Sequence, residues 1–336
     1  MRPVIESVDP KFALPGGEIR VKGSGLMSVA GEAPRVMFGS EDGTVLFGSR
    51  SHLVTQVPDE ATGPMVIGAG EETATWDVAI AQVIAENLHP VANPAVDRDG
   101  NVFVTFSGAR GQAVPIAIYK IDTNLNVSPY VNEMMNATGL ALDAEGMLYV
   151  SSRADGTVYQ VTPNGEISTY AQGMGVATGI AFDHERNLYV GDRSGTIFKI
   201  ATDRQIYVYA TLEPSMAAYH LAFSPNGNLY VTSPSTSSND AVYEIDPHGT
   251  VTVYYRGLGR PQGLAFDFDG NLYVAASLAG NRGIVKIDRA QHASLVVSGN
   301  NLVGLAFAPD SSVVLATNDA VHHLGWEIAG RVLVAD

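Results

Sequence analysis

Apolar and polar residues alternate along most of this chain in the short pattern that is typical of β-strands. From residue 94 onward, one order recurs: a short apolar run, a polar turn, then a second apolar run rich in β-branched and aromatic residues. Several of the turns carry Asp-Gly or Asn-Gly, as a tight hairpin requires. The six segments begin 40 to 45 residues apart, at Pro94, Gly139, Gly179, His220, Gly263 and Gly304.

Two more apolar runs complete most of these units. A third run occupies residues 156–161, 195–200, 240–245 and 282–287, and a fourth occupies 167–171, 206–210 and 251–255. Four antiparallel strands in about 40–45 residues are typical of one propeller blade. No segment keeps a helical period. We therefore predict an all-β chain with a six-bladed β-propeller over residues 81–336.

The ring can close in two ways. Residues 81–88 precede the first unit and have the pattern of a fourth strand, so they can complete the last blade and cover two sheet edges. The tail, residues 331–336, competes for the same place. The sequence leaves both alternatives open.

Residues 1–80 lack the repeat and predict a small β-sandwich. Short alternating runs at 18–23, 34–40, 65–70 and 75–81 are separated by turn signals such as Pro15-Gly16-Gly17. The opening, residues 3–26, resembles the start of an IPT/TIG immunoglobulin-like domain. No Gly/Ser-rich or charged linker separates the two domains, so we expect a fixed arrangement.

Composition narrows the classes of partner. The net charge of −15 argues against nucleic acid or an anionic membrane, because both are bound through Lys and Arg. The chain has no cysteine, which excludes disulfides and thiolate metal sites. No stretch of 18 apolar residues occurs, and the first residues do not look like a signal peptide. We expect a monomer and favour a cytoplasmic location.

The repeated Gly-Leu-Ala-Phe-Asp…Gly-Asn-Leu-Tyr-Val unit resembles the NHL repeat. It is similar to a broader six-bladed group that includes gluconolactonase/SMP-30, virginiamycin B lyase and strictosidine synthase, and the resemblance covers residues 81–336. It implies a propeller that is either an interaction platform or an enzyme.

Gluconolactonase-like members hold a divalent cation on the propeller axis, so the resemblance implies a Ca²⁺ or Mg²⁺ site here. It points to Asn93, Asn136 and Glu213 as ligands. The family's Asn before the inner strand corresponds to Asn93, Thr138, Thr178, Tyr219, Gln262 and Val303, of which only Asn93 fits. A virginiamycin B lyase-like mechanism needs a catalytic His, for which His220 is the candidate.

Common catalytic motifs are missing: no Gly-x-Ser-x-Gly, Walker loop, His-Glu-x-x-His or Gly-x-Gly-x-x-Gly occurs. The Asp97-x-Asp99-Gly and Asp267-x-Asp269-Gly segments vaguely resemble calcium loops, but we interpret them as hairpin turns because the other calcium ligands are missing. His322 and His323 are adjacent on a predicted strand and face opposite sides, so we expect structural roles.

Arginines gather in one kind of loop. In a propeller, the loops from the fourth strand to the next inner strand, and from the second to the third, share one face. Arg suits carboxylate or phosphate through its planar fork, unless each Arg pairs with an internal acid such as Asp155, Asp192 or Glu213. The six arginines in or beside these loops are Arg110, Arg153, Arg193, Arg256, Arg260 and Arg282, while acids such as Asp143, Glu145, Asp183 and Glu185 fall on the opposite hairpins.

His220 differs from the other repeats because it stands where four of the six carry Gly. Tyr219 precedes it and Glu213 is in the same loop. A His beside a carboxylate can serve as general base or metal ligand. We expect His220 at the channel mouth, with Arg193 and Gln262 as neighbours, or else a His that only bonds loop backbone.

Two functions follow. The first is a binding scaffold whose mouth holds a small anionic or sugar-like ligand, or a peptide, through Arg110, Arg153, Arg193, Tyr219, His220, Arg260, Gln262 and Arg282. The second is a metal-dependent hydrolase or lyase acting on a lactone or ester. We favour binding.

Overall fold

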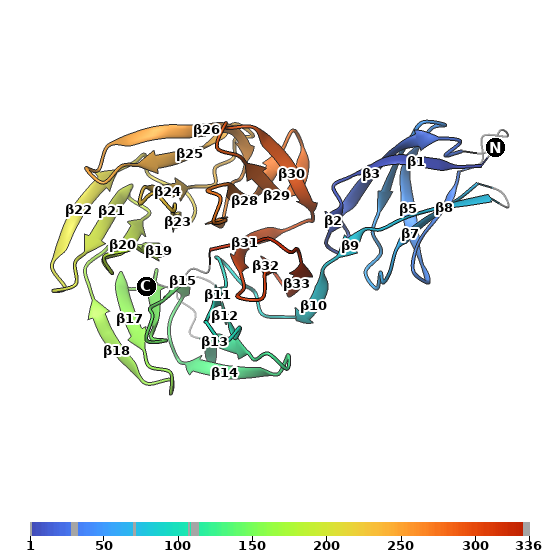
Figure 1. Ribbon diagram of the computed structural model, residues 1–336. Helices are drawn as coiled ribbons and strands as arrows, with labels where there is room; N and C mark the ends of the chain where they lie inside the picture. Colours follow the sequence, from blue (N-terminus) through green and yellow to red (C-terminus); the bar gives the residue numbers. More distant parts are fainter. Residues whose placement is uncertain (1, 28–32, 70–71, 107, 109–113, 332–336) are drawn as a thin grey trace.

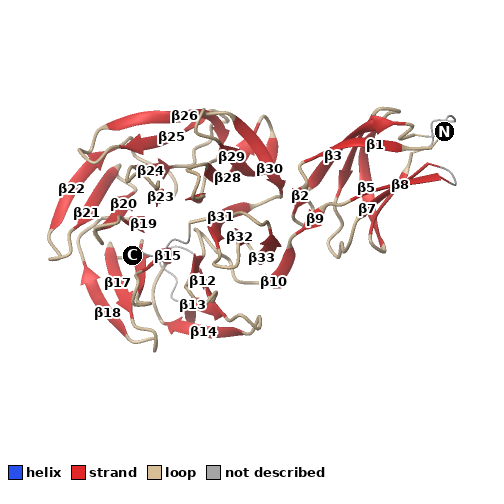
Figure 2. Cartoon of the chain, viewed as in Figure 1, coloured by secondary structure: helices blue, strands red, loops and turns tan. Residues whose placement is uncertain are grey.

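The computed structural model describes residues 2–27, 33–69, 72–106, 108 and 114–331 (Figure 1). Over these residues all the regular structure is β-strand, as Figure 2 shows, which confirms the predicted all-β class. No helix in the described part of the chain could cross a membrane.

The N-terminal part forms one sheet whose two end strands, β1 and β8, contact each other. Strand β3 alternates exposed and buried residues, as expected for a strand with one face on a core. The core contains Val21, Phe38, Leu53 and Ile67. In sheet order, the strands are β1 (Val4–Asp9), β3 (Glu18–Ser24), β6 (His52–Gln56), β5 (Glu41–Gly48), β4 (Arg35–Phe38), β7 (Met65–Ala69) and β8 (Glu72–Trp76).

The described residues after this sheet form four separate four-stranded sheets and one ten-stranded sheet. Three of the separate sheets follow the chain order. They are β11 (Ala95–Val96), β12 (Val102–Thr105), β13 (Ile116–Ile121) and β14 (Val127–Asn132); β15 (Ala137–Leu142), β16 (Leu148–Ser152), β17 (Thr157–Val161) and β18 (Ile167–Ala171); and β19 (Ala177–Phe182), β20 (Leu188–Asp192), β21 (Thr196–Ile200) and β22 (Ile206–Thr211).

The ten-stranded sheet contains two further four-stranded runs. They join where Leu258 and Gly259 of one pair with Leu278 and Ser277 of the other. The first run is β23 (His220–Phe223), β24 (Leu229–Thr232), β25 (Asp240–Ile245) and β26 (Val251–Gly259). The second is β27 (Leu264–Phe266), β28 (Leu272–Leu278), β29 (Asn281–Ile287) and β30 (Ala293–Ser298), and the sheet continues through β2 (Phe12–Ala13) to β9 (Ala79–Ile80).

The fourth separate sheet shows how the ring closes. It comprises β31 (Leu302–Phe307), β32 (Ser312–Thr317), β33 (Val321–Gly325) and, as its outer strand, β10 (Gln82–Ala85). The predicted segment 81–88 therefore occupies the closing position. Of the tail, the structure describes only Arg331, whose backbone N–H donates to Phe266 O and whose guanidinium donates to Ser224 O. Residues 332–336 lie outside the described residues.

The inner strands define a propeller-like arrangement. Neighbouring inner strands contact one another in the order β11, β15, β19, β23, β27 and β31, and β31 contacts β11 again. Figure 1 shows the sheets arranged around a common centre, with the N-terminal sheet beside the ring.

Glycines at the start of the inner strands let neighbouring backbones meet. The Gly179 N–H donates to Tyr219 O at 2.8 Å, and the Gly263 N–H donates to Val303 O at 3.1 Å. A Cβ on Gly179 would lie 2.3 Å from Tyr219 O. Only a residue without a side chain fits such a contact.

We expect Gly179→Ala to destabilise the protein by about 2 kcal/mol or more, because the added methyl group meets backbone that cannot move aside. Gly325→Ala is the matched control, since a Cβ there meets nothing within 4 Å. Chemical denaturation monitored by tryptophan fluorescence measures both. Equal stability of the two variants would contradict this account of the inner ring.

At the other end of the blades, hairpin acids are used by their own turns. The Asp183 carboxylate accepts hydrogen bonds from the backbone of Glu185 and Asn187 and from the Tyr189 hydroxyl. The Tyr189 ring then packs edge-on against Phe223 of the next blade. Tyr149 and Tyr273 repeat the pattern with Asp143 and Phe182, and with Asp267 and Phe307. These acids therefore stabilise their own turns and, through the tyrosines, help to join neighbouring blades.

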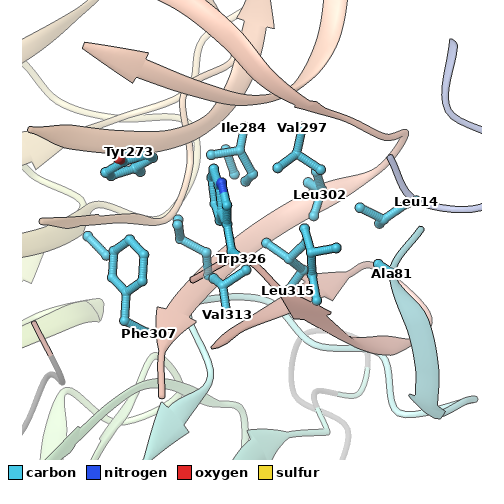
Figure 3. Close-up of a cluster of buried hydrophobic side chains, with 14 residues drawn as sticks. Leu14, Ala81, Tyr273, Ile284, Val297, Leu302, Phe307, Val313, Leu315 and Trp326 are labelled. Atoms are coloured by element: carbon cyan, nitrogen blue, oxygen red, sulfur yellow. The ribbon is translucent and has the colours of Figure 1, made fainter. Parts of the chain in front are cut away.

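The N-terminal sheet and the propeller share a hydrophobic core. Strand β2 pairs in parallel with β30, the outer strand of the β27–β30 run, and with β9. Figure 3 shows Leu14 and Ala81 at one side of a hydrophobic cluster that also contains Val297, Leu302 and Trp326 of the propeller. The Trp326 ring also lies 5.5 Å from that of Phe12 and 5.3 Å from that of Tyr273. This core fixes the position of the N-terminal domain.

His322 and His323 have opposite surroundings. His322 is 6% exposed and its Nδ1 has no hydrogen-bond partner within the described residues. His323 is half-buried, with its Nε2 4.0 Å from an Asp310 carboxylate oxygen. The two imidazoles therefore cannot hold one ion together. Burial lowers the pKa of His322 from its ordinary 6.5 to about 4.

We expect acid to destabilise the protein partly through His322. An unfolded histidine binds a proton near pH 6.5, whereas folded His322 does so only near pH 4. The free energy of unfolding should therefore fall as the pH drops through this window, by at most about 3 kcal/mol for one such group. Urea denaturation at pH 7.5 and pH 5.0 should show a smaller drop for His322→Leu than for the unsubstituted protein.

His323→Leu is the matched control, because its side chain is already partly in water. It should leave the drop nearly unchanged. A His322→Leu variant as acid-sensitive as the unsubstituted protein would show that His322 does not contribute.

Candidate functional site

A cleft of about 660 Å³ lies between the β28–β29 hairpin and the loops that lead into the inner strands β27 and β31. The loop from β26 to β27 contributes Arg260 and Gln262, and the β28–β29 hairpin contributes Arg282. The junction of the two runs forms part of its wall, because Gly259 and Ser277 both line it. The other lining residues are Thr236, Ser237, Ser238, Ala276, Gly280, Gly283, Gly299, Asn301, Leu302, Val303 and Asn318.

Among the described residues, the lining carries positive charge and no carboxylate. Arg260 and Arg282 are exposed, and within the described residues neither guanidinium has a hydrogen bond or an ion pair. Hydroxyl and amide side chains supply the remaining polar groups. Guanidinium stays charged at any physiological pH and matches carboxylate in a two-pronged geometry. In a chain of net charge −15, this cleft is suited to an anion.

Gln262 is held in place at the start of its inner strand. Its Nε2 donates to Leu302 O at 3.2 Å, and its backbone carbonyl oxygen accepts from Thr232 Oγ1 at 2.5 Å. Its backbone N–H donates to Ala275 O at 2.8 Å. The residue therefore joins three neighbouring segments while its side chain lines the cleft.

The other predicted arginines hold loops. Arg153 donates to Gly108 O at 3.2 Å. Arg193 donates to Ser215 O at 3.4 Å and to Met216 O. Their loops lie at the end of the blades where the inner strands begin, but neither residue lines the cleft of Arg260 and Arg282. Arg110 lies outside the described residues.

Tyr219 and His220 are packed inside the ring. Tyr219 is 1% exposed; its hydroxyl donates to the Glu213 backbone oxygen, and burial raises its pKa to about 12. His220 is 3% exposed, and its ring has no hydrogen bond or ion pair within the described residues. Burial lowers the pKa of His220 to about 4, so the imidazole is neutral at pH 7. Its ring therefore has no hydrogen bond or ion pair with the expected neighbours Glu213, Arg193 and Gln262.

The three candidate metal ligands do not fit a divalent cation. The Asn93 amide donates to Leu264 O at 2.9 Å and accepts from the Leu305 N–H at 3.1 Å, so it bridges two inner strands. Asn136 is buried and donates to Gly108 O at 3.4 Å, whereas Glu213 is exposed. Among the described residues, no group of three His, Asp or Glu side chains is arranged to hold a metal. We derive no metal chemistry from these residues.

Sequence reasoning missed the uncharged part of the cleft. Ser237, Ser238, Asn301 and Asn318 line it. The signal for Ser237 and Ser238 was a Ser/Thr-rich stretch, residues 232–238, between the second and third strands of one unit. Such a stretch predicts only an ordinary loop. It becomes part of a cleft because the loops of neighbouring blades meet there.

We expect His220→Ala to lower stability while leaving ligand affinity within about two-fold, because the ring is buried and does not line the cleft. Thermal unfolding and titration with a sugar acid measure the two effects separately. A large loss of affinity with unchanged stability would show that His220 belongs to the binding site.

Comparisons with known proteins match this architecture. Residues 3–72 match the IPT/TIG domain family. No curated protein matches the chain. An auxiliary nutrient binding protein from Bacteroides thetaiotaomicron VPI-5482 is similar over both parts, with 13% identity, 97% of this chain and 98% of that chain covered, and a TM-score of 0.57.

Two further solved structures resemble mainly the propeller. A candidate gluconolactonase shares 15% identity, with 75% of this chain and 93% of that chain covered and a TM-score of 0.61. A streptogramin B lyase shares 15% identity, with 78% and 86% covered and a TM-score of 0.53. The chain therefore combines an N-terminal TIG domain with a propeller-like fold that occurs in binding proteins and in enzymes. At these identities the likeness concerns the fold alone.

Proposed function

We propose that this chain is a binding protein with a TIG domain over residues 1–80 and a six-bladed propeller over residues 81–336, counting the ten-stranded sheet as two blades. Its ligand is a small, hydroxyl-rich anion such as a sugar acid. The observation that carries the proposal is the cleft lined by Arg260 and Arg282, to which the part of the chain that the structure describes contributes no carboxylate. A solved structure with the same two-part fold bears the name of a nutrient binding protein, which supports a binding role.

The chemistry of the cleft favours such a ligand over a purely apolar one. The two guanidinium groups can each donate two parallel hydrogen bonds to a carboxylate. Ser237, Ser238 and Asn301 can exchange hydrogen bonds with the hydroxyls of a sugar. A small ligand is then oriented by its charge at one end and by its hydroxyls along its length.

Hydrolysis of a lactone or ester is the second candidate function, and it rests on the resemblance to a candidate gluconolactonase. Arg260 and Arg282 could stabilise a negatively charged oxygen in such a reaction. Of the residues that the structure describes, no Asp, Glu, His, Lys or Tyr lines the cleft where it could act as general base. Binding without turnover is therefore the function that this lining supports best.

We expect D-galacturonate to bind and Arg260→Gln or Arg282→Gln to weaken it about ten-fold or more, because each removes a charged hydrogen-bonding pair. Isothermal titration calorimetry measures the affinity, which should also fall as salt is raised. Arg289→Gln is the matched control, since this exposed Arg lies in a hairpin at the opposite end of the same blade. Equal affinities for all three variants would contradict the proposed site.

A further inference from the structure

A second cleft, of about 380 Å³, lies between the TIG domain and the propeller. From the TIG side it is lined by Asp9, Pro10, Gly17, Glu18 and Arg20. From the propeller side it is lined by the β28–β29 hairpin, by Ser294, Leu295 and Ser298 of β30, and by Asn300. The mixture of carboxylates, amides and hydroxyls suits hydrogen bonding with a polyhydroxylated molecule.

The two clefts adjoin at the β28–β29 hairpin. Gly280 and Arg282 line both of them. Strands β28 and β29 are joined by Ala279 and Gly280, which have φ values of 48° and 87° as a two-residue turn requires. A Cβ on Gly280 would meet nothing within 4 Å. The hairpin tip between the clefts is therefore small and exposed, and Arg282 lies beside it.

The TIG domain holds this hairpin from the far side. The Arg20 guanidinium donates to Asn281 Oδ1, and the Asn281 amide donates to Leu278 O at 3.3 Å. Beside it, the Glu18 N–H donates to Ser298 Oγ at 2.8 Å, and Asn300 Nδ2 donates to Gly16 O at 3.1 Å. These contacts and the β2–β30 pairing keep the second cleft open at a fixed width.

We propose that the ligand is an oligomer of sugar acids, at least two units long, that crosses the hairpin tip and occupies both clefts. This inference rests on the proposed function of the first cleft. The charged group of one unit lies between Arg260 and Arg282, and the next unit extends past Gly280 toward the TIG domain. There its hydroxyls donate to Asp9 and Glu18 and accept from Asn300, while Arg20 keeps unused donors for a second carboxylate. The TIG domain is thus part of the binding site.

The dependence of affinity on the length of the ligand tests this proposal directly. We expect trigalacturonic acid to bind the full chain about ten-fold or more tightly than galacturonic acid, because a second linked contact adds to the first. Arg20→Gln removes a charged donor that the TIG domain contributes to the second cleft. Ser294→Tyr places a large side chain in that cleft from an exposed position of β30. Each should reduce the advantage of the trimer to within about three-fold of the monomer.

Arg50→Gln is the matched control, since this exposed TIG Arg lines neither cleft. If the trimer has no advantage, or if both variants keep it in full, the two-cleft inference is overturned and the proposed function stands. If neither sugar acid binds the unsubstituted protein, both are overturned. Circular dichroism of each variant shows whether the fold is kept.

Discussion

The contact between neighbouring inner strands determines how this molecule is built. At Gly179 and Gly263, backbone meets the backbone of the next blade closely enough for direct N–H···O hydrogen bonds. Asn93, which precedes β11, adds a side-chain link: its amide bonds to Leu264 of β27 and Leu305 of β31. Because the inner strands touch at their starts, the loops that lead into them converge. Residues of three successive blades therefore line one cleft.

The two ends of the propeller differ in how their charges are used. At one end, acids such as Asp183 accept hydrogen bonds from their own turns and from a buried tyrosine. These carboxylates are needed by the fold and lie far along the strands from the arginine loops. At the other end, Arg260 and Arg282 have no acidic partner among the described residues. An acidic protein thereby keeps a local positive cleft.

Much of the fold could be predicted because its signals are local. Alternation, hairpin turns and a period of 40 to 45 residues predict the strands, whereas the pattern of residues 81–88 made it only one of two candidates for the closing strand. Arg260, Gln262 and Arg282 come together because they have corresponding loop positions. The same rule selected Arg153 and Arg193, whose guanidinium groups turn to backbone carbonyls instead. Arg20 had no sequence signal, because its place depends on pairing between β2 and β30 over two residues.

The central claim is that an anionic, hydroxyl-rich ligand occupies the cleft of Arg260 and Arg282. A crystal structure of the full chain grown with galacturonate tests it most directly. We expect the galacturonate carboxylate to lie within hydrogen-bond distance of both guanidinium groups, and the sugar hydroxyls to face Ser237, Ser238 and Asn301. A ligand held instead by a cation beside Asn93, or bound over the acidic hairpins at the opposite end, would contradict it.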